Sequence, residues 1–87
     1  MWFIYILLCD DHSYYIGSTD NLERRLKDHQ SGHGSFYTSQ HKPLRILYTE
    51  KFSTYEEARK REAQLKKWSR AKKEALIIDN KELLKRL

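Results

Sequence analysis

The chain has 87 residues, of which 39% are hydrophobic and 33% are charged. This length suits one small domain, expected to span residues 1–87, without a second catalytic or specificity domain. The hydrophobic content argues against a disordered chain. The net charge of +5 and the pI near 9.4 mildly favour a polyanionic partner, because phosphate neutralisation with counterion release drives most non-specific nucleic-acid binding.

The cysteine content and the apolar segments indicate the compartment. Cys9 is the only cysteine, so an internal disulfide and a cysteine zinc site are excluded, and a reducing compartment is expected. The apolar run Trp2–Cys9 is too short to span a bilayer, and no basic segment precedes it. We therefore expect a cytoplasmic protein with no membrane partner.

The first 19 residues predict a β-hairpin. Residues 2–8 are aromatic and aliphatic, residues 10–13 are polar, and Tyr14-Tyr15-Ile16 follow before Gly17. A helix is then expected from a capping residue, Asp20 or Asn21, because Leu22 and Leu26 share one face and the pattern ends at residues 31–32.

The rest of the chain predicts a loop, a strand and further helices. Residues 32–43 lack a clear period and are expected to form a loop, whereas residues 44–52 alternate as a strand does. Ser53 or Thr54 caps a long helix, Ser69 restarts a helix through Ile77, and Asn80 caps a last short helix. The order strand, strand, helix, strand, helix, helix predicts an α+β fold, a small three-stranded antiparallel sheet flanked by helices.

Two tyrosine segments and three polar residues resemble a known family. Phe3-Ile4-Tyr5 is followed, ten residues after its tyrosine, by residues 15–19, Tyr-Ile-Gly-Ser-Thr. Together with Arg25 and His29 on the first predicted helix and Glu62 further on, these segments resemble the GIY-YIG nuclease domain. The resemblance covers nearly the whole chain and implies the GIY-YIG fold.

The basic segment Lys66-Lys67-Trp68 narrows the resemblance. It is similar to the end of the domain in a small stand-alone bacterial subfamily, the largely uncharacterised UPF0213-like proteins. Phe3 departs from the family pattern, because it stands where the motif name has a glycine. This substitution removes backbone freedom near the site and weakens the expectation of catalysis.

Strand alternation gives a geometric test of the tyrosine pair. If residues 10–12 form a three-residue loop, Tyr5 opposes Gly17 and Tyr15 lies diagonal to Tyr5, at roughly 7–8 Å between the backbones. Both hydroxyls then reach one phosphate. A two-residue loop would place the tyrosines on opposite faces, and the alternative to a site is a pair of strand tyrosines with surface phenols.

Arg25 and His29 are four residues apart, so on a helix they are neighbours, with Cβ atoms roughly 5–6 Å apart. The guanidinium would bind a phosphate oxygen and stabilise the transition state. Comparable arginines raise the rate of phosphoryl transfer by a factor of roughly 10³–10⁵. The imidazole would orient or deprotonate a tyrosine or a water. The alternative is an ordinary solvated helix face.

Glu62 is the only acid between Arg59 and Lys73. It would either pair with Lys66 at i, i+4, worth only a few tenths of a kcal/mol, or bind a hard metal ion. Mg²⁺ commonly takes one or two carboxylates and completes its octahedron with water and phosphate oxygens. His12, His33 and His41 lack the spacing of a zinc site and are assigned no chemistry.

Cations alternate with an aromatic residue in the C-terminal half, as they do on surfaces that follow a nucleic-acid backbone. The alternatives are a core role for Trp68 and cations that only solvate their helices. The expected binding residues are Lys27, Lys66, Lys67, Trp68, Arg70, Lys72 and Lys73.

The resemblance implies a metal-dependent phosphodiesterase. Glu62 would hold one Mg²⁺ or Mn²⁺, Tyr5 would activate water with help from Tyr15 or His29, and Arg25 would stabilise the transition state. We expect a monomer that acts on branched, nicked or single-stranded DNA, in a setting such as DNA repair, with low sequence specificity. A catalytically weak or inactive nucleic-acid-binding module, acting through the basic helices, is the alternative, and a protein-interaction domain with a vestigial site is a third. The nuclease interpretation requires the five site residues to come together on one face.

Overall fold

The computed structural model describes residues 1–79, and the short helix expected after Asn80 lies outside this range. Three antiparallel strands form one sheet in the order β2-β1-β3, with β1 (Trp2–Cys9) between β2 (Tyr14–Thr19) and β3 (Pro43–Phe52). The predicted α+β class and three-stranded sheet are confirmed. Within residues 1–79, no helix is both long enough and apolar enough to cross a membrane.

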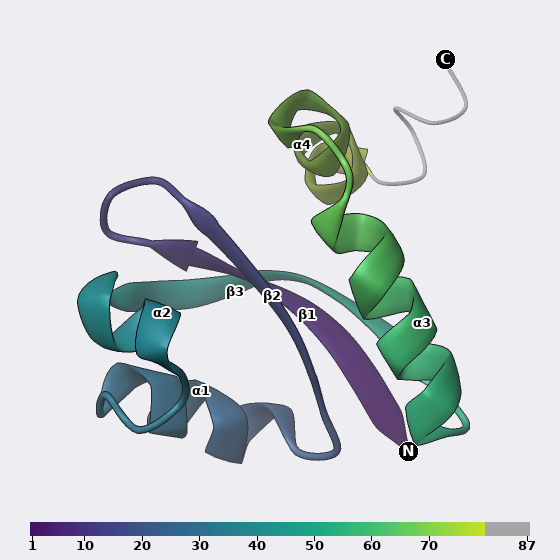
Figure 1. Cartoon of the computed structure of the whole chain (residues 1–87), viewed down its shortest axis with the longest axis horizontal. Helices are drawn as coiled ribbons and strands as arrows, with labels where there is room; N and C mark the ends of the chain where they lie inside the picture. Colours follow the sequence, from purple (N-terminus) through teal and green to yellow (C-terminus); the bar gives the residue numbers. More distant parts are fainter. Residues whose placement is uncertain (80–87) are drawn as a thin grey trace.

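Within the described part of the chain, four helices cover the sheet (Figure 1). Helices α1 (Leu22–Gln30) and α2 (Phe36–Gln40) lie on one side, and α3 (Tyr55–Lys66) and α4 (Arg70–Asp79) lie on the other. The expected caps form at Asn21 and Thr54, whose side chains accept hydrogen bonds from the backbone N–H groups of Arg24 and Glu57. The sheet is thus covered by two pairs of helices, each pair close in sequence.

The short helix α2 corrects the prediction of a loop over residues 32–43. It has only five residues, too few to show a hydrophobic period. Ser35 caps it, because its side chain accepts a hydrogen bond from the N–H of Thr38. Its one buried residue is also Thr38, and the site described below uses that side chain.

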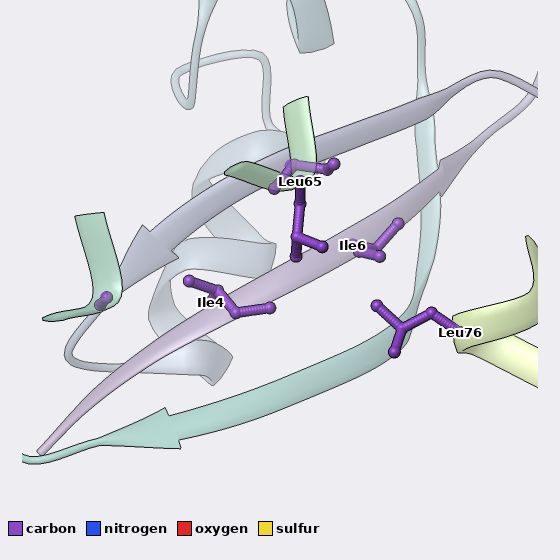
Figure 2. Packing of buried hydrophobic residues seen from close by; sticks show 6 residues of the cluster. Ile4, Ile6, Leu65 and Leu76 are labelled. Atoms are coloured by element: carbon purple, nitrogen blue, oxygen red, sulfur yellow. The ribbon is translucent and has the colours of Figure 1, made fainter. Parts of the chain in front are cut away.

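The hydrophobic core lies between the sheet and the pair α3–α4. Ile4 and Ile6 of the central strand point toward Leu65 of α3 and Leu76 of α4 (Figure 2). Alternation along β1 then directs Tyr5 and Leu7 to the other face, toward α1 and α2. All four strand residues are at most 2% exposed, so β1 is buried on both faces.

Candidate active site on the tyrosine face of the sheet

The hairpin register brings the two tyrosines to one face. Tyr5 pairs with Gly17, Leu7 pairs with Tyr15, and the N–H of Cys9 donates to the carbonyl of Ser13 at 2.9 Å. The loop therefore has three residues, and its third, His12, has a φ of +68°, the left-handed geometry that such loops use. The rings of Tyr5 and Tyr15 lie with their centroids 6.3 Å apart.

Gly17 makes room for the Tyr5 ring. A Cβ atom at residue 17 would overlap the Tyr5 hydroxyl oxygen and lie 2.7 Å from its Cζ, as well as 3.2 Å from Cε1 of Tyr15. Any other residue there would displace Tyr5 from its position over β2. The glycine thus has a structural role beneath the tyrosine pair.

His29 joins Tyr5 to helix α2. Its Nε2 lies 2.8 Å from the Tyr5 hydroxyl and its Nδ1 lies 2.7 Å from Oγ1 of Thr38, and the histidine is completely buried. We assign the His29 proton to Nδ1, the tautomer in which the Thr38 hydroxyl donates to the carbonyl of Ser35 and accepts from Nδ1–H. In this tautomer Nε2 of His29 accepts a hydrogen bond from the Tyr5 hydroxyl.

Burial determines the charge states of this pair. Burial, and then the nearby Arg25 guanidinium, lower the pKa of His29 to about 4, so the imidazole is neutral at pH 7. Burial raises the pKa of Tyr5 to about 12, against the opposing effect of the hydrogen bond from Arg25. Tyr5 is therefore a phenol that donates to an imidazole.

Arg25 lies at the rim of the same cluster. Its Nε donates to the Tyr5 hydroxyl at 3.4 Å, and one terminal nitrogen donates to the carbonyl of Gly34 at 2.8 Å. The side chain is 31% exposed, so its guanidinium is within reach of a ligand from solvent. Its sequence neighbour Arg24 points away and pairs with Asp20 on the exposed surface at 3.1 Å.

Glu62 approaches the cluster from the other face of the sheet. Its Oε1 accepts a hydrogen bond from Ser18 at 2.7 Å, and Ser18 alternates with Gly17, so its side chain points toward α3. Its Oε2 pairs with Lys66 at 2.8 Å, the i, i+4 contact considered above. The carboxylate is nevertheless near enough to contribute to the raised pKa of Tyr5.

The structure thus brings four of the five predicted site residues together. The fifth, Glu62, lies on the opposite face of the sheet, beside strand β2. Tyr5, Tyr15, Arg25 and His29 lie over one face, whereas Glu62 reaches edge strand β2 through Ser18. A ligand that touches both Arg25 and Glu62 has to cross the edge of β2. The expectation of a single shared face holds for the first four only.

One divalent cation would fit at Glu62 as the only protein carboxylate. Within residues 1–79, no group of three or more histidine, cysteine or acidic residues is arranged to hold a metal ion. The two hydrogen bonds to Glu62 leave lone pairs on a carboxylate that has about four acceptor positions. This donor set suits Mg²⁺, which is commonly held by one carboxylate, water and substrate phosphates.

Most of the predicted nucleic-acid-binding residues lie on the side of α3 and α4. Trp68 packs against the hydrophobic core. The Arg61 guanidinium carbon lies 5.1 Å from the centroid of the Trp68 ring, and Nζ of Lys72 lies 4.2 Å from it. Arg70 lies over the Tyr14 ring at 4.2 Å. Lys66 and Lys67 are exposed at the end of α3, Lys73 is half-buried on α4, and Lys27 is exposed on α1.

The sequence did not identify the residues that hold the cluster in place. A Cβ at Gly34 would overlap Nδ1 of His29, and the Gly34 carbonyl also holds Arg25. Thr38 fixes the imidazole, and Ser18 holds Glu62. A weak signal existed in Ser35, three residues before Thr38, which is the spacing of a helix cap.

Comparison with known proteins gives a consistent result. The model of the GIY-YIG catalytic domain family matches residues 1–75. A UPF0213 protein of Natronomonas pharaonis is 42% identical over 77 residues, which are 88% of this chain and 91% of that protein. A UPF0213 protein of Streptococcus pneumoniae is 41% identical over 80 residues, 92% of this chain and 81% of that one.

Solved structures agree with the sequence comparison. The solution NMR structure of a UPF0213 protein from Bacillus halodurans has a TM-score of 0.58 at 41% identity, covering 93% of this chain and 88% of that one. A second NMR structure, from E. faecalis, has a TM-score of 0.56 at 45% identity, with 83% and 77% covered. The chain therefore belongs to the GIY-YIG family, a nuclease family that generally uses a divalent metal ion and acts on nucleic acid, and its relatives include the UPF0213 proteins.

Proposed function

We propose that this protein is a metal-dependent endonuclease that hydrolyses phosphodiester bonds in branched, nicked or single-stranded DNA with low sequence specificity. The observation that carries the proposal is the chain of hydrogen bonds from the partly exposed Arg25 through buried Tyr5 to buried His29. Burying the polar groups of Tyr5 and His29 is costly unless each is paired. Here each one is paired, and the chain ends at a guanidinium within reach of solvent.

Arg25 binds a non-bridging oxygen of the scissile phosphate. Its planar fork suits a phosphate, and its charge stabilises the negative charge that grows in the transition state. Tyr15, on the same face and partly exposed, contacts the substrate beside it. This pair aligns the phosphate over the Tyr5 hydroxyl.

Tyr5 and His29 move the proton of the attacking water. A phenol with a pKa near 12 is a poor base by itself, so Tyr5 takes the water proton only as it passes its own proton to Nε2 of His29. The imidazole is neutral at pH 7, so its Nε2 lone pair is free to accept a proton, but its lowered pKa makes it a weak base. The negative phosphate nearby then favours the imidazolium that forms.

Glu62 is the proposed ligand of one Mg²⁺ or Mn²⁺. The ion, when bound, supplies positive charge that stabilises the developing charge on the phosphate and the leaving oxygen. Glu62 requires no help from a second acid, because water and phosphate oxygens complete the coordination of these ions. We expect the chain to act as a monomer in the cytoplasm, where its single buried cysteine stays reduced.

A second candidate function is a nucleic-acid-binding module with little or no turnover. The burial of the reactive pair favours it, since Tyr5 is 2% exposed and His29 is 0% exposed. Both oxygens of Glu62 are also occupied, by Ser18 and Lys66. In that function the exposed lysines of α3 and α4 bind the DNA backbone, with affinities near 10⁻⁴–10⁻⁶ M at physiological salt, on the order of those typical of non-specific binding.

One experiment separates the two functions. Purified protein is incubated with branched, single-stranded and supercoiled DNA and Mg²⁺ or Mn²⁺, beside Arg25→Ala and Glu62→Ala. The nuclease predicts cleavage that both substitutions abolish, whereas the module predicts salt-dependent binding without cleavage. Arg24→Ala is the matched control, because Arg24 is an exposed arginine on the same helix and should leave cleavage unchanged. Cleavage that survives in both site variants would refute the mechanism.

A further inference from the structure

A row of aromatic rings lies beside the hydrogen-bonded cluster. Tyr15 is stacked against Tyr37 of α2, with centroids 5.8 Å apart and planes at 25°. Tyr37 is in turn stacked against His41, with centroids 4.1 Å apart and planes at 16°. We call Tyr15, Tyr37 and His41 the aromatic row.

The aromatic row is partly exposed, although Tyr37 is stacked between Tyr15 and His41. All three members are partly exposed, whereas His29 beneath them is completely buried. Stacked aromatic planes in contact lie about 3.5–4 Å apart, so centroids separated by 5.8 Å show that Tyr15 and Tyr37 overlap only in part. Phe36, the residue before Tyr37 on α2, is 82% exposed.

Charge differs between the two ends of the aromatic row. At the Tyr15 end, Arg25 donates to the carbonyl of Gly34 and remains partly exposed. At the other end, Asp11 bonds to Nδ1 of His41, and hydrogen bonds from Ser13 and from His41 lower the pKa of Asp11 to about 2. Arg25 has Asp28 at 4.0 Å and Asp11 is paired with His41, so the two ends differ in whether the cation or the carboxylate faces the row. We expect a phosphate at the Arg25 end, with an uncharged ring on the platform beside it.

We propose that the aromatic row stacks against one unpaired nucleobase of DNA, whose own phosphate lies on Arg25. This inference rests on the proposed function, which makes DNA the ligand, and it narrows the substrate to DNA with an unpaired nucleotide at the site. A base in an intact duplex has both faces stacked on its neighbours, so it offers no free face to the row. Single strands, flaps and branch points do offer one.

Trp68 does not provide a comparable platform. It packs against the hydrophobic core on the other side of the sheet, and Arg61 and Lys72 already lie against its ring. The aromatic row is linked to Arg25 through Tyr5, whose ring centroid lies 6.3 Å from that of Tyr15 and whose hydroxyl accepts from Arg25. Base stacking is therefore assigned to the row and not to the basic helices.

The test measures binding without turnover. The full chain is titrated, in EDTA, into a thymidine oligonucleotide that carries one 2-aminopurine, and separately into a blunt duplex of the same length. Stacking on the row should quench the 2-aminopurine of the single strand. Tyr37→Ala should weaken single-strand binding about tenfold, as loss of one stacked base does, and leave duplex binding unchanged. Tyr37→Phe should retain both quenching and affinity, because the ring is kept.

Two further variants guard against loss of the fold. Phe36→Ala removes an 82%-exposed side chain and should reduce single-strand affinity a few-fold without changing thermal stability. Tyr55→Ala is the control. Tyr55 of α3 is 43% exposed and packs against Trp2 of β1, so its removal should not alter either affinity. If Tyr37→Ala is unstable, the wild type alone decides the test, with one 2-aminopurine placed in the single strand and one in the duplex. Quenching in the single strand only supports the proposal, whereas equal quenching in both DNAs, or none in either, overturns it.

Cleavage is measured in parallel, so the two proposals fail in different ways. Cleavage by the wild type combined with unchanged single-strand affinity in Tyr37→Ala would overturn the aromatic platform and leave the nuclease standing. Tyr37-dependent single-strand binding without cleavage would support the platform and overturn the nuclease. Equal losses on single strand and duplex would show a general contact and also overturn the platform.

Discussion

The two faces of strand β1 are both buried, but they are buried in different ways. Ile4 and Ile6 pack against α3 and α4 as an ordinary apolar core. On the other face, Tyr5 packs against a histidine and an arginine that need hydrogen bonds to stay buried. We expect the apolar face to be the larger source of stability, and the polar network, which is costly to bury, supports the proposal of an active site on the tyrosine face.

Truncating the apolar face should give the largest loss of stability. Leu65 is completely buried among Ile4, Ile6 and Leu76, so Leu65→Ala is expected to lower the free energy of unfolding by about 2–5 kcal/mol. Chemical denaturation measures the loss. Gln64→Ala, an exposed neighbour on α3, is the control. A loss below about 1 kcal/mol would show that this face is not the main core.

Acidification should act on the tyrosine face. The pKa of His29 is about 4 in the fold, below its ordinary value of 6.5, so the unfolded chain binds the proton more readily. The stability from neutral His29 is thus complete above pH 6.5 and is lost as the pH falls through 4. At about 1.4 kcal/mol per pKa unit, this loss amounts to at most about 3 kcal/mol.

Denaturation midpoints between pH 7.5 and pH 4 test this expectation. His29→Gln keeps a polar side chain that does not titrate, so its stability should fall less over the same pH interval than that of the wild type. His33→Gln, at an exposed histidine just beyond α1, should follow the wild type. Parallel curves for the wild type and His29→Gln would contradict the buried neutral imidazole.

Thr38→Val should give a smaller effect, confined to the tyrosine face. The substitution keeps the shape but removes the hydroxyl that accepts from Nδ1–H of His29, which leaves a buried donor unpaired at a cost of about 1–3 kcal/mol. It should also lower cleavage, because the imidazole is no longer held with Nε2 toward Tyr5. Thr38→Ser restores the hydroxyl and should recover both properties. Failure of Thr38→Ser to do so would indicate that the side-chain shape matters and the hydroxyl does not.

Much of the strand arrangement could be predicted, because it depends on local rules. Strand alternation predicted Tyr5 opposite Gly17 and on the same face as Tyr15 for a three-residue loop, which is the loop that forms. Asn21 and Thr54, which cap α1 and α3, were each one of two adjacent candidates in the sequence. These features depend on residues that are close in the chain.

The remaining features depend on how distant segments pack. Helix α2 has too few residues to show a period, so Thr38 and Tyr37 could not be assigned to the site. The position of Glu62 depends on how α3 crosses the sheet, and the bond to Ser18 spans 44 residues. Trp68 was ambiguous in sequence because it packs on the core and also lies between two cations.

An active site on the tyrosine face is tested by the rate at which supercoiled plasmid is nicked in Mg²⁺ by the wild type, by Arg25→Ala and by Arg24→Ala. Arg25→Ala should lower this rate about 10³-fold or more, as loss of a transition-state arginine does, while Arg24→Ala should retain it. Equal nicking by all three proteins, or none by the wild type, would contradict an active site on the tyrosine face.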